Sequence, residues 1–415
     1  MNVCVIGLGK IGLPLAVHFA KKGNRVIGAD VNGETVNLVN AGLEPFPEEE
    51  GLQESLSQVI KNKLLSATTK NADAVSNSEV IVVVVPLFVD INAEPDFRAL
   101  DSVTVDIGKS LRKGMLVSYE TTVPIGTTRE RFLPVLEKIS GLKAGIDFNL
   151  VFSPERVLTG RVFSDLRKYP KIVGGISESC TRAGVDFYSK VIEFDKRDDL
   201  PKPNGVWAMD STESAEFVKL AETTYRDVNI ALANQFSKYA TKRNLNIHEI
   251  IQASNSQPFS HIHLPGISVG GHCIPVYPQF YLWNDPEATI VRHARTTNKG
   301  MPEYFVSKLE EEIGNLQGKS VLILGVSYRA RVKETAFSGA YDVRDSLLSR
   351  GAKPFFIDPL YTTAELVKLG FQSDFVPDNI DAIILHTAHQ NFLDLDFTKF
   401  RNLKHVLDGR NFLNA

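Results

Sequence analysis

The chain has 415 residues, more than a single hydrophobic core organises, and at about 150 residues per domain this length suggests two or three domains. Its 46 Lys and Arg residues nearly balance 49 Asp and Glu residues, and the net charge of −3 excludes broad electrostatic attraction to nucleic acid or to an anionic membrane. With 43% hydrophobic and 23% charged residues, the composition is that of a globular α/β protein.

The three cysteines, Cys4, Cys180 and Cys273, are odd in number and widely spaced. This excludes a disulfide framework and a Cys-x-x-Cys metal clip, so we expect a reducing compartment and no metal. The N-terminus leads directly into a strand-like run without the pattern of a secretory leader, and no apolar stretch reaches about 18 residues. We therefore expect a cytoplasmic protein.

The first part of the chain alternates short β-branched runs with helix-length amphipathic segments, which is typical of βαβ units. A strand is predicted at residues 2–9, followed by a helix at 13–22 and a second strand at 25–30. Further strands are predicted at residues 80–86, 115–120, 149–153, 171–176 and 191–194, and a helix at 97–111. They indicate a doubly wound parallel sheet that ends near the polar, Pro-rich stretch 195–205.

Residues 212–244 contain neither Pro nor Gly, and apolar residues recur there at steps of three and four, which predicts one long helix. About 30 residues at about 1.5 Å each span roughly 45 Å. Because this is longer than one domain needs, we expect the helix to bridge domains and to carry a dimer interface. A core helix within one large domain is the alternative.

After Lys319 the strand pattern begins again. Residues 320–325 read as a buried strand ending in Gly, and residues 351–358 repeat the spacing of residues 23–30, with an Asp seven residues after a Gly. Later strands are expected at 381–386 and 405–408. The predicted fold is two Rossmann-like doubly wound parallel sheets joined by a long central helix, with domains at 1–200, 201–315 and 316–415. Ligands bind at the carboxyl ends of the strands in such sheets.

Gly7, Gly9 and Gly12 form a G-x-G-x-x-G motif between the first strand and its helix, and Asp30 closes the second strand. Gly7 allows the tight turn, Gly9 admits a pyrophosphate and Gly12 packs helix on strand. A carboxylate at Asp30 accepts from ribose hydroxyls and repels a 2′-phosphate, which predicts NAD rather than NADP. The alternative is a glycine turn without a cofactor. Further cofactor contacts are expected from Lys10, Ile11, Val85, Pro86 and Thr122.

Cys273 lies in a Gly-rich loop that also holds a histidine, so its thiol is a candidate nucleophile, although a lone cysteine is more often inert packing. Cys4 and Cys180 are well explained as packing. Lys219 lies on the long helix beside an apolar stripe, where a solvated lysine is the ordinary interpretation. A partly desolvated ammonium at a cleft could instead stabilise a developing alkoxide.

Five motifs carry a specific resemblance. They are GLGKIG at 7–12, ETTVPIGT at 120–127, SPERVL at 153–158, VKL at 218–220 continuing into TYRDVNIALAN at 224–234, and GGHCIP at 270–275. In this order they resemble the motifs of the UDP-glucose/GDP-mannose dehydrogenase family over nearly the whole chain. The strings at 153–158, 224–234 and 270–275 are most similar to the branch that acts on UDP-N-acetylmannosamine and UDP-N-acetylglucosamine.

The resemblance implies oxidation of the sugar C6 alcohol to a carboxylate with two NAD used in succession. Carried over to this chain, Cys273 would trap the C6 aldehyde as a thiohemiacetal, which is oxidised to a thioester and hydrolysed. Lys219 would stabilise oxyanions, Glu155 would act as general acid and base for hydrolysis, and Thr122 would hold a water beside C6.

The resemblance also implies that the third domain binds the UDP part of the substrate. Arg329 matches a basic residue of the family and could bridge cofactor domain and substrate, and Arg410 is a plausible second cation. The alternative for both is a surface arginine beside a strand. The remaining expected substrate contacts are Glu155, Arg156, Val157, Leu158, Lys219, Thr223, Arg226, Gly266 and Gly270. No nucleic acid or membrane partner is expected. We expect a homodimer or a multiple of dimers.

Three departures from the family pattern bear on the chemistry. Tyr277 stands four residues after the candidate nucleophile, where the family usually has Asp, and Thr223 replaces an Asn one turn after Lys219. Ala336 replaces an Arg in the C-terminal motif. A Tyr cannot be an anion near pH 7 and a Thr offers one hydroxyl rather than an amide, so the water network around Lys219 must be rebuilt or lost. The alternatives to the N-acetylhexosamine enzyme are therefore a UDP-glucose 6-dehydrogenase and a nucleotide-sugar-binding relative with impaired chemistry.

Overall fold

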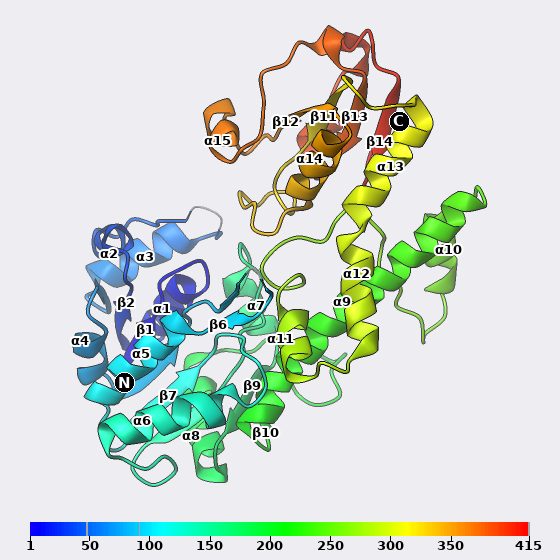
Figure 1. Cartoon of the computed structure of the whole chain (residues 1–415). Helices are drawn as coiled ribbons and strands as arrows, with labels where there is room; N and C mark the ends of the chain where they lie inside the picture. Colours follow the sequence, from blue (N-terminus) through cyan, green and yellow to red (C-terminus); the bar gives the residue numbers. More distant parts are fainter. Residues whose placement is uncertain (47–48, 91, 414–415) are drawn as a thin grey trace. The chain divides into compact units, whose positions relative to one another are not determined.

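The computed structural model describes residues 1–46, 49–90 and 92–413. Two compact units, Met1–Ala221 and Glu222–Ala415, are separated by a point within the long helix α9 (Thr212–Lys242) (Figure 1). The long helix that the sequence predicts is therefore confirmed, and the three-domain division stays a prediction. In the described ranges no helix combines the length and the apolar character needed to cross a membrane.

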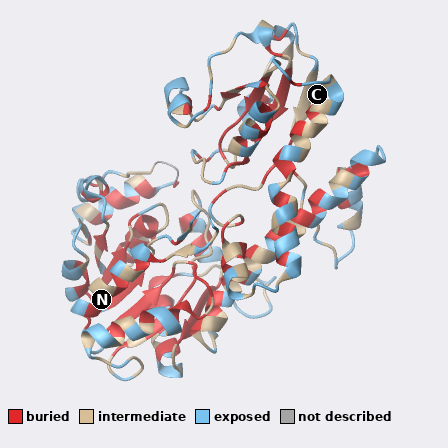
Figure 2. Ribbon diagram, in the orientation of Figure 1, coloured by how far each residue is buried: buried red, intermediate tan, exposed pale blue. Residues whose placement is uncertain are grey.

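The first unit is built on an eight-stranded sheet with the order β10-β9-β8-β7-β4-β1-β2-β3. Its strands in chain order are β1 (Asn2–Ile6), β2 (Arg25–Ala29), β3 (Leu65–Thr68), β4 (Val80–Val83), β7 (Leu116–Tyr119), β8 (Asn149–Phe152), β9 (Lys171–Gly175) and β10 (Val206–Met209). A small ribbon, β5 (Phe88–Val89) with β6 (Pro95–Asp96), is separate. The central strands are almost wholly buried, as Figure 2 shows, because helices cover the sheet.

Most neighbouring strands of this sheet run parallel, but β9 is antiparallel to β8 and β10 is parallel to β9. The doubly wound α/β fold is confirmed, and its last two strands reverse direction. The prediction of a strand at residues 191–194 is wrong, because α8 (Glu178–Val191) continues to the start of that range. Phe187, Tyr188 and Val191 enter the core at helical spacing. The sheet instead gains β10, which lies beyond the expected boundary.

Helices cover the sheet of the first unit. α1 (Gly12–Lys21), α3 (Leu52–Lys61), α7 (Val162–Lys168) and α8 share one apolar core with the strands. Figure 1 shows α5 (Arg98–Ser110) and α6 (Leu133–Ser140) together across the sheet, and α5 also packs against α4 (Asn71–Ser76). The remaining elements are α2 (Gly33–Asn40) and a π-helical turn, η1 (Thr128–Phe132). Cys4 and Cys180 are buried in this unit, in agreement with a packing role.

The second unit holds a parallel four-stranded sheet with the order β12-β11-β13-β14, which confirms the second Rossmann-like sheet. Its strands are β11 (Ser320–Leu324), β12 (Lys353–Ile357), β13 (Ala382–Leu385) and β14 (His405–Asp408). One core contains side chains of α13 (Met301–Ile313), α14 (Gly339–Ser349) and α15 (Thr363–Lys368). A second contains side chains around η2 (Pro377–Asn379), η3 (Gln390–Phe392) and η4 (Phe397–Lys399).

The rest of the second unit is helical. It comprises the C-terminal part of α9 with α10 (Ile247–Ser254), α11 (Tyr277–Asn284) and α12 (Thr289–Lys299). A small core joins α9 to α10, and α11 packs against α12. A segment without regular structure, residues 255–276, leads from α10 to α11 and contains the GGHC motif.

Candidate active site

The Gly-rich turn after β1 has the backbone geometry that the motif predicts. Gly7 has φ of +94°, and a Cβ on Gly12 would lie 1.8 Å from the Gly7 carbonyl oxygen, so neither position accepts a side chain. A Cβ on Gly9 would meet none of the described protein atoms within 4 Å. The space above Gly9 is therefore open, as the approach of a pyrophosphate requires.

Asp30 is fixed against the same turn. Its Oδ2 accepts a 2.8 Å hydrogen bond from the Leu8 N–H, and its Oδ1 accepts one of 2.8 Å from the Asn32 N–H. The side chain is only partly buried, so each oxygen keeps a lone pair for a ribose hydroxyl. Behind it α1 begins at Gly12 after Ile11, whose apolar side chain cannot cap the first N–H groups. Lys10 and Ile11 are half-buried beside this helix end. The residues fit a dinucleotide.

The other predicted cofactor residues lie where β4 and β7 end. Val85 is half-buried and Pro86 exposed, and the Thr121 hydroxyl donates a 2.6 Å hydrogen bond to the Val85 carbonyl. Thr122 is buried. β1, β2, β4 and β7 are parallel, so their carboxyl ends share one edge of the sheet and bring these residues together.

α9 is tied to the loop that follows β7. The buried Glu216 carboxylate accepts hydrogen bonds from the Gly126 N–H at 2.6 Å and from the Thr128 N–H and hydroxyl at 2.9 and 2.7 Å. Burial raises the pKa of Glu216 to about 7, and these hydrogen bonds oppose the rise. Lys219 follows three residues later on the same helix and is 7% exposed. It is therefore a desolvated lysine rather than the solvated one that a surface helix would carry.

Glu155 follows β8 and is held by three donors. Its Oε1 accepts from the Arg156 and Val157 N–H groups at 2.7 and 3.1 Å, and its Oε2 accepts from Lys171 Nζ at 3.0 Å. Leu158 donates its N–H to Asp165 at 3.2 Å. The backbone N–H groups of residues 156–158 are thus bonded to carboxylates of the chain itself, which fixes this loop.

In the second unit, Cys273 is partly exposed in a bend just before α11. Its carbonyl accepts a 2.9 Å hydrogen bond from the Tyr277 N–H. Two preceding glycines bring this loop against the Tyr328 side chain: a Cβ on Gly270 would lie 2.7 Å from Tyr328 Cβ, and one on Gly271 2.8 Å from the Tyr328 ring. Gly271 also has φ of +87°. The thiol is displayed on a turn that these glycines hold in place.

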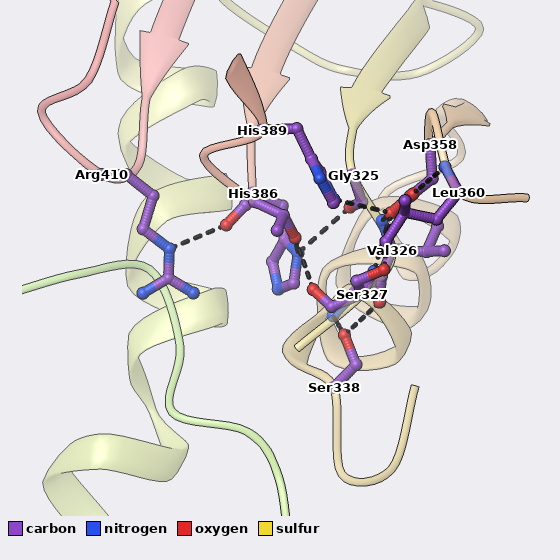
Figure 3. Close-up of polar contacts among 11 residues, drawn as sticks. Gly325, Val326, Ser327, Ser338, Asp358, Leu360, His386, His389 and Arg410 are labelled. Carbon is purple, nitrogen blue, oxygen red and sulfur yellow. Dashed lines mark hydrogen bonds and ion pairs between the residues drawn. The ribbon is translucent and has the colours of Figure 1, made fainter. Parts of the chain in front are cut away.

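Arg410, just beyond β14, contacts the same segment, and Figure 3 shows its hydrogen bond to the His386 carbonyl. Its Nε donates to the His386 carbonyl at 2.8 Å, and its two other nitrogens donate to the carbonyl and hydroxyl of Ser268 at 3.0 Å each. A Cβ on Gly266 would lie 2.8 Å from this guanidinium, so a side chain there would require the guanidinium to shift. Burial lowers the pKa of Arg410 to about 10, and the guanidinium stays charged at neutral pH. It is not a surface arginine.

His386 completes this network. Its Nδ1 faces the Gly325 carbonyl at 3.1 Å, so Nδ1 carries the proton and Nε2 accepts from the Ser268 hydroxyl at 2.9 Å. Burial, with Arg410 nearby, lowers the pKa of His386 to about 3, and the ring stays neutral. The network holds the segment before Cys273 against the carboxyl edge of the second sheet.

The other predicted residues of the second unit range from exposed to buried. Arg329 lies 5.9 Å from the ring centroid of Tyr328. Arg226 is exposed on α9. Burial lowers the pKa of His263, and the positive charge of Arg226 lowers it further. Thr223 is buried on the same helix, and Tyr277 is half-buried at the start of α11 with its ring stacked on Phe280, 5.8 Å between centroids.

Sequence reasoning did not single out several residues that the structure places in or beside these networks. They are Lys171, Tyr188, Glu216, Ser268 and His386. No local motif marks any of them; each acquires its role through a contact with a residue distant in the sequence. Among residues 1–46, 49–90 and 92–413, no group of three or more His, Cys, Asp or Glu side chains could hold a metal ion.

Three family models match the chain. The NAD-binding domain of the UDP-glucose/GDP-mannose dehydrogenase family matches residues 1–192, the central domain of that family residues 213–300, and its UDP-binding domain residues 322–415. A UDP-N-acetyl-D-mannosamine dehydrogenase of Pyrococcus horikoshii is 33% identical over 100% of this chain and 96% of its own length. The chain belongs to the UDP-glucose/GDP-mannose dehydrogenase family.

Solved structures agree with this family membership. A UDP-D-ManNAc dehydrogenase from Pyrococcus horikoshii superposes with a TM-score of 0.90 at 30% identity, covering 100% of this chain and 96% of that chain. A UDP-glucose dehydrogenase from Pyrobaculum islandicum has a TM-score of 0.88 at 26% identity, covering 99% and 94%. As a member of the UDP-glucose/GDP-mannose dehydrogenase family, the chain is an NAD-dependent oxidoreductase that acts on a UDP-linked sugar, and the predicted NAD cofactor is confirmed.

Proposed function

We propose that this protein oxidises the C6 alcohol of a UDP-N-acetylhexosamine, UDP-N-acetylmannosamine or UDP-N-acetylglucosamine, to the carboxylate in a four-electron reaction. The observation that carries the proposal is the pairing of a full-length match to a UDP-N-acetyl-D-mannosamine dehydrogenase with a partly exposed Cys273 on a glycine-supported turn. NAD, when bound, accepts a hydride in each of the two oxidations.

The first oxidation produces an aldehyde at C6. An aldehyde cannot readily lose a further hydride until a nucleophile makes its carbon tetrahedral. In the proposed mechanism, the Cys273 thiolate adds to that carbon and forms a thiohemiacetal, which also stops the aldehyde from escaping. The ammonium of Lys219 stabilises the negative charge on the C6 oxygen, and its burial in the first unit strengthens such an interaction.

Loss of the second hydride from the thiohemiacetal leaves a thioester on Cys273. A water molecule then attacks the acyl carbon and gives its proton to Glu155, the C–S bond breaks, and Cys273 leaves as the thiolate. The carboxylate of Glu155 is held in one orientation by the Arg156 and Val157 N–H groups, which suits a general base. Thr122, buried after β7, is proposed to hold a water beside C6.

The UDP part of the substrate is proposed to bind the second unit, whose family model is the UDP-binding domain. Arg329 is the proposed cation for this ligand. Arg410 uses three of its nitrogens on Ser268 and His386, so its proposed role is to shape the site as well as to add positive charge. Arg226, Gly266, Gly270 and residues 156–158 remain proposed substrate contacts.

We further propose that the protein is a homodimer or a multiple of dimers, formed through α9. Tyr225, Leu232, Phe236 and Tyr239 are large apolar residues that are exposed on this helix. Their separations of seven, four and three residues place them on one helix face. A second copy of the same face would cover this apolar surface.

A substrate panel tests the proposed function. Purified protein is incubated with NAD and UDP-N-acetylmannosamine, UDP-N-acetylglucosamine or UDP-glucose, and NADH and the uronate product are measured. The proposal expects uronate from an N-acetylhexosamine substrate with the highest kcat/KM. Preference for UDP-glucose would favour the alternative that the Pyrobaculum islandicum relative suggests. Tight UDP-sugar binding without NADH would favour the impaired relative that Tyr277 and Thr223 suggest.

A further inference from the structure

A buried ammonium links Glu155 to a second carboxylate. Lys171, the first residue of β9, places its Nζ 3.0 Å from Glu155 Oε2 and 2.6 Å from Glu120 Oε2. The three side chains are 5%, 11% and 0% exposed. Glu120 directly follows β7 and Glu155 lies just beyond β8, so the order of neighbouring strands brings the three together. The whole cluster lies within the first unit.

Each carboxylate is also fixed at its other oxygen. Glu120 Oε1 accepts a 2.6 Å hydrogen bond from the Tyr188 hydroxyl, which lies 2.7 Å from Ser118 Oγ. Glu155 Oε1 accepts from two backbone N–H groups, as described above. Lys171 Nζ additionally lies 4.9 Å from the centroid of the Tyr188 ring. These bonds leave Glu155 a single orientation.

The cluster has more carboxylates than cations. Burial raises the pKa of Glu120, and the charge of Lys171 only partly opposes this rise. Burial also acts upward on Glu155, but the charge and hydrogen bond of Lys171 outweigh it and lower the pKa of Glu155. The remaining titratable or charged groups around Glu155 and Lys171 are Arg156, Asp165, Tyr169 and Tyr188. A proton taken up by the pair therefore resides on Glu120 rather than on Glu155.

We propose that Lys171 is a positioning residue that keeps Glu155 ionised and correctly oriented for the hydrolysis step, with Glu120 as the neighbour that takes the excess proton. This inference rests on the proposed function, because it assigns Glu155 as the base that receives the proton of the attacking water. An ionised base is required for that transfer, and a buried carboxylate without a cation would be neutral at pH 7.

Rapid mixing of the Lys171→Met variant with NAD and UDP-N-acetylmannosamine tests the step. We expect the first turnover to release NADH with a burst close to that of the wild type, and the steady-state rate to fall by about 10²-fold. Mass spectrometry should then find the acyl group on the Cys273 peptide. Lys171→Arg should recover part of the steady-state rate. Lys190→Met removes an exposed lysine of α8 and serves as the matched control. An unchanged steady-state rate in Lys171→Met would overturn the proposal.

The pH profile separates positioning of Glu155 from a general loss of structure. A base works only when deprotonated, so the rate falls as the pH drops below its pKa. Lys171→Met raises that pKa, and the acid limb of kcat should move upward by about 1 to 3 pH units. Glu120→Gln puts a neutral amide in place of a carboxyl that already holds the proton in the acid range, so its acid limb should stay in place. An upward shift in Glu120→Gln, or no shift in Lys171→Met, would contradict the assignment.

Thermal unfolding gives a readout that needs no substrate. In the wild type, the pKa of Glu155 is lower in the folded protein than in the unfolded chain. This difference stabilises the fold when the pH is above the pKa of the unfolded chain, and the stabilisation is lost as the pH falls. In Lys171→Met both buried carboxylates lack a cation, their pKa values rise, and stability is lost as the pH increases instead. The difference in melting temperature between Lys171→Met and the wild type should therefore grow from pH 5 to pH 8, and less so in the Lys171→Met/Glu120→Gln double variant.

These readouts distinguish two kinds of failure. If the wild type oxidises no UDP-sugar but the melting temperatures follow the expected pH dependence, the charge cluster stands and the proposed function fails. If the wild type forms uronate but the steady-state rate, the acid limb of kcat and the melting temperatures of Lys171→Met match those of the wild type, the function stands and the role of Lys171 is wrong.

Discussion

Asp30 and Asp358 occupy equivalent positions in the two sheets. Asp30 Oδ2 accepts from the Leu8 N–H at 2.8 Å and Asp358 Oδ2 from the Val326 N–H at 2.9 Å, in each case just after a glycine with φ near +94°. The copies differ in what else they bind. Asp358 also accepts from the Ser327 N–H and hydroxyl and lies 3.2 Å from His389 Nε2, and its side chain is fully buried. Of these two aspartates, only Asp30 has a carboxylate available to a ribose.

Cofactor choice should therefore depend on Asp30. Asp30→Ser removes the acceptor for the ribose hydroxyls and the charge that repels a 2′-phosphate, so the ratio of kcat/KM for NAD over NADP should fall by about tenfold or more. Steady-state kinetics with both cofactors measure it. A wild-type enzyme that reduces NADP as fast as NAD would show that Asp30 does not set the preference.

Cys273→Ser should abolish formation of the uronate. The serine hydroxyl is a far weaker nucleophile at neutral pH than a thiolate, and an oxygen ester is hydrolysed more slowly than a thioester. Product analysis by mass spectrometry should find no uronate and could detect a trapped sugar ester. Cys4→Ser, in the buried β1, is a control for loss of a thiol as such. Normal uronate production by Cys273→Ser would remove this residue from the mechanism.

Tyr277 tests whether the water network of the family has been rebuilt. We expect Tyr277→Phe to lower kcat by several-fold while KM for the UDP-sugar changes little, because only the hydroxyl is removed and the stacking on Phe280 is kept. Stopped-flow and steady-state kinetics separate the two parameters. If Tyr277→Phe behaves as the wild type while Tyr277→Asp with Thr223→Asn is faster, the network has been lost rather than rebuilt.

Dimer formation should depend on the apolar face of α9. Phe236→Glu places a charge within the exposed set of Tyr225, Leu232 and Tyr239, so we expect it to shift the protein toward monomer in sedimentation velocity. Lys190→Glu, on α8, changes charge outside this face and should leave the sedimentation coefficient unchanged. A wild-type protein that is active and strictly monomeric would overturn the dimer.

Much of the fold follows from local patterns in the sequence. Buried β-branched runs predict β1, β4 and β11 because such strands read as continuous apolar segments. The same signal misleads at residues 191–194, where Val191 and Ile192 are buried at the end of a helix rather than in a strand. The direction of β9 was beyond such patterns, because it depends on which neighbour a strand meets and not on its own residues.

The sequence predicts some residues of the candidate site and not others. Gly7, Asp30 and Cys273 are marked by spacing and by motif. Lys171 and His386 are not, because a lysine at a strand start or a histidine after a strand has no distinctive pattern. Lys171 reaches Glu120 across 51 positions of sequence, and His386 reaches Ser268 across 118. Only the strand order and the packed loop determine these contacts.

The most direct test of the central claim is the electron count. Complete conversion of a limiting amount of UDP-N-acetylmannosamine with excess NAD should yield two NADH for each UDP-sugar consumed, with uronate as the only sugar product. Absorbance at the end point and mass spectrometry of the sugar give both numbers from one reaction. One NADH per sugar with an accumulating aldehyde, or no NADH at all, would contradict the four-electron oxidation proposed for this protein.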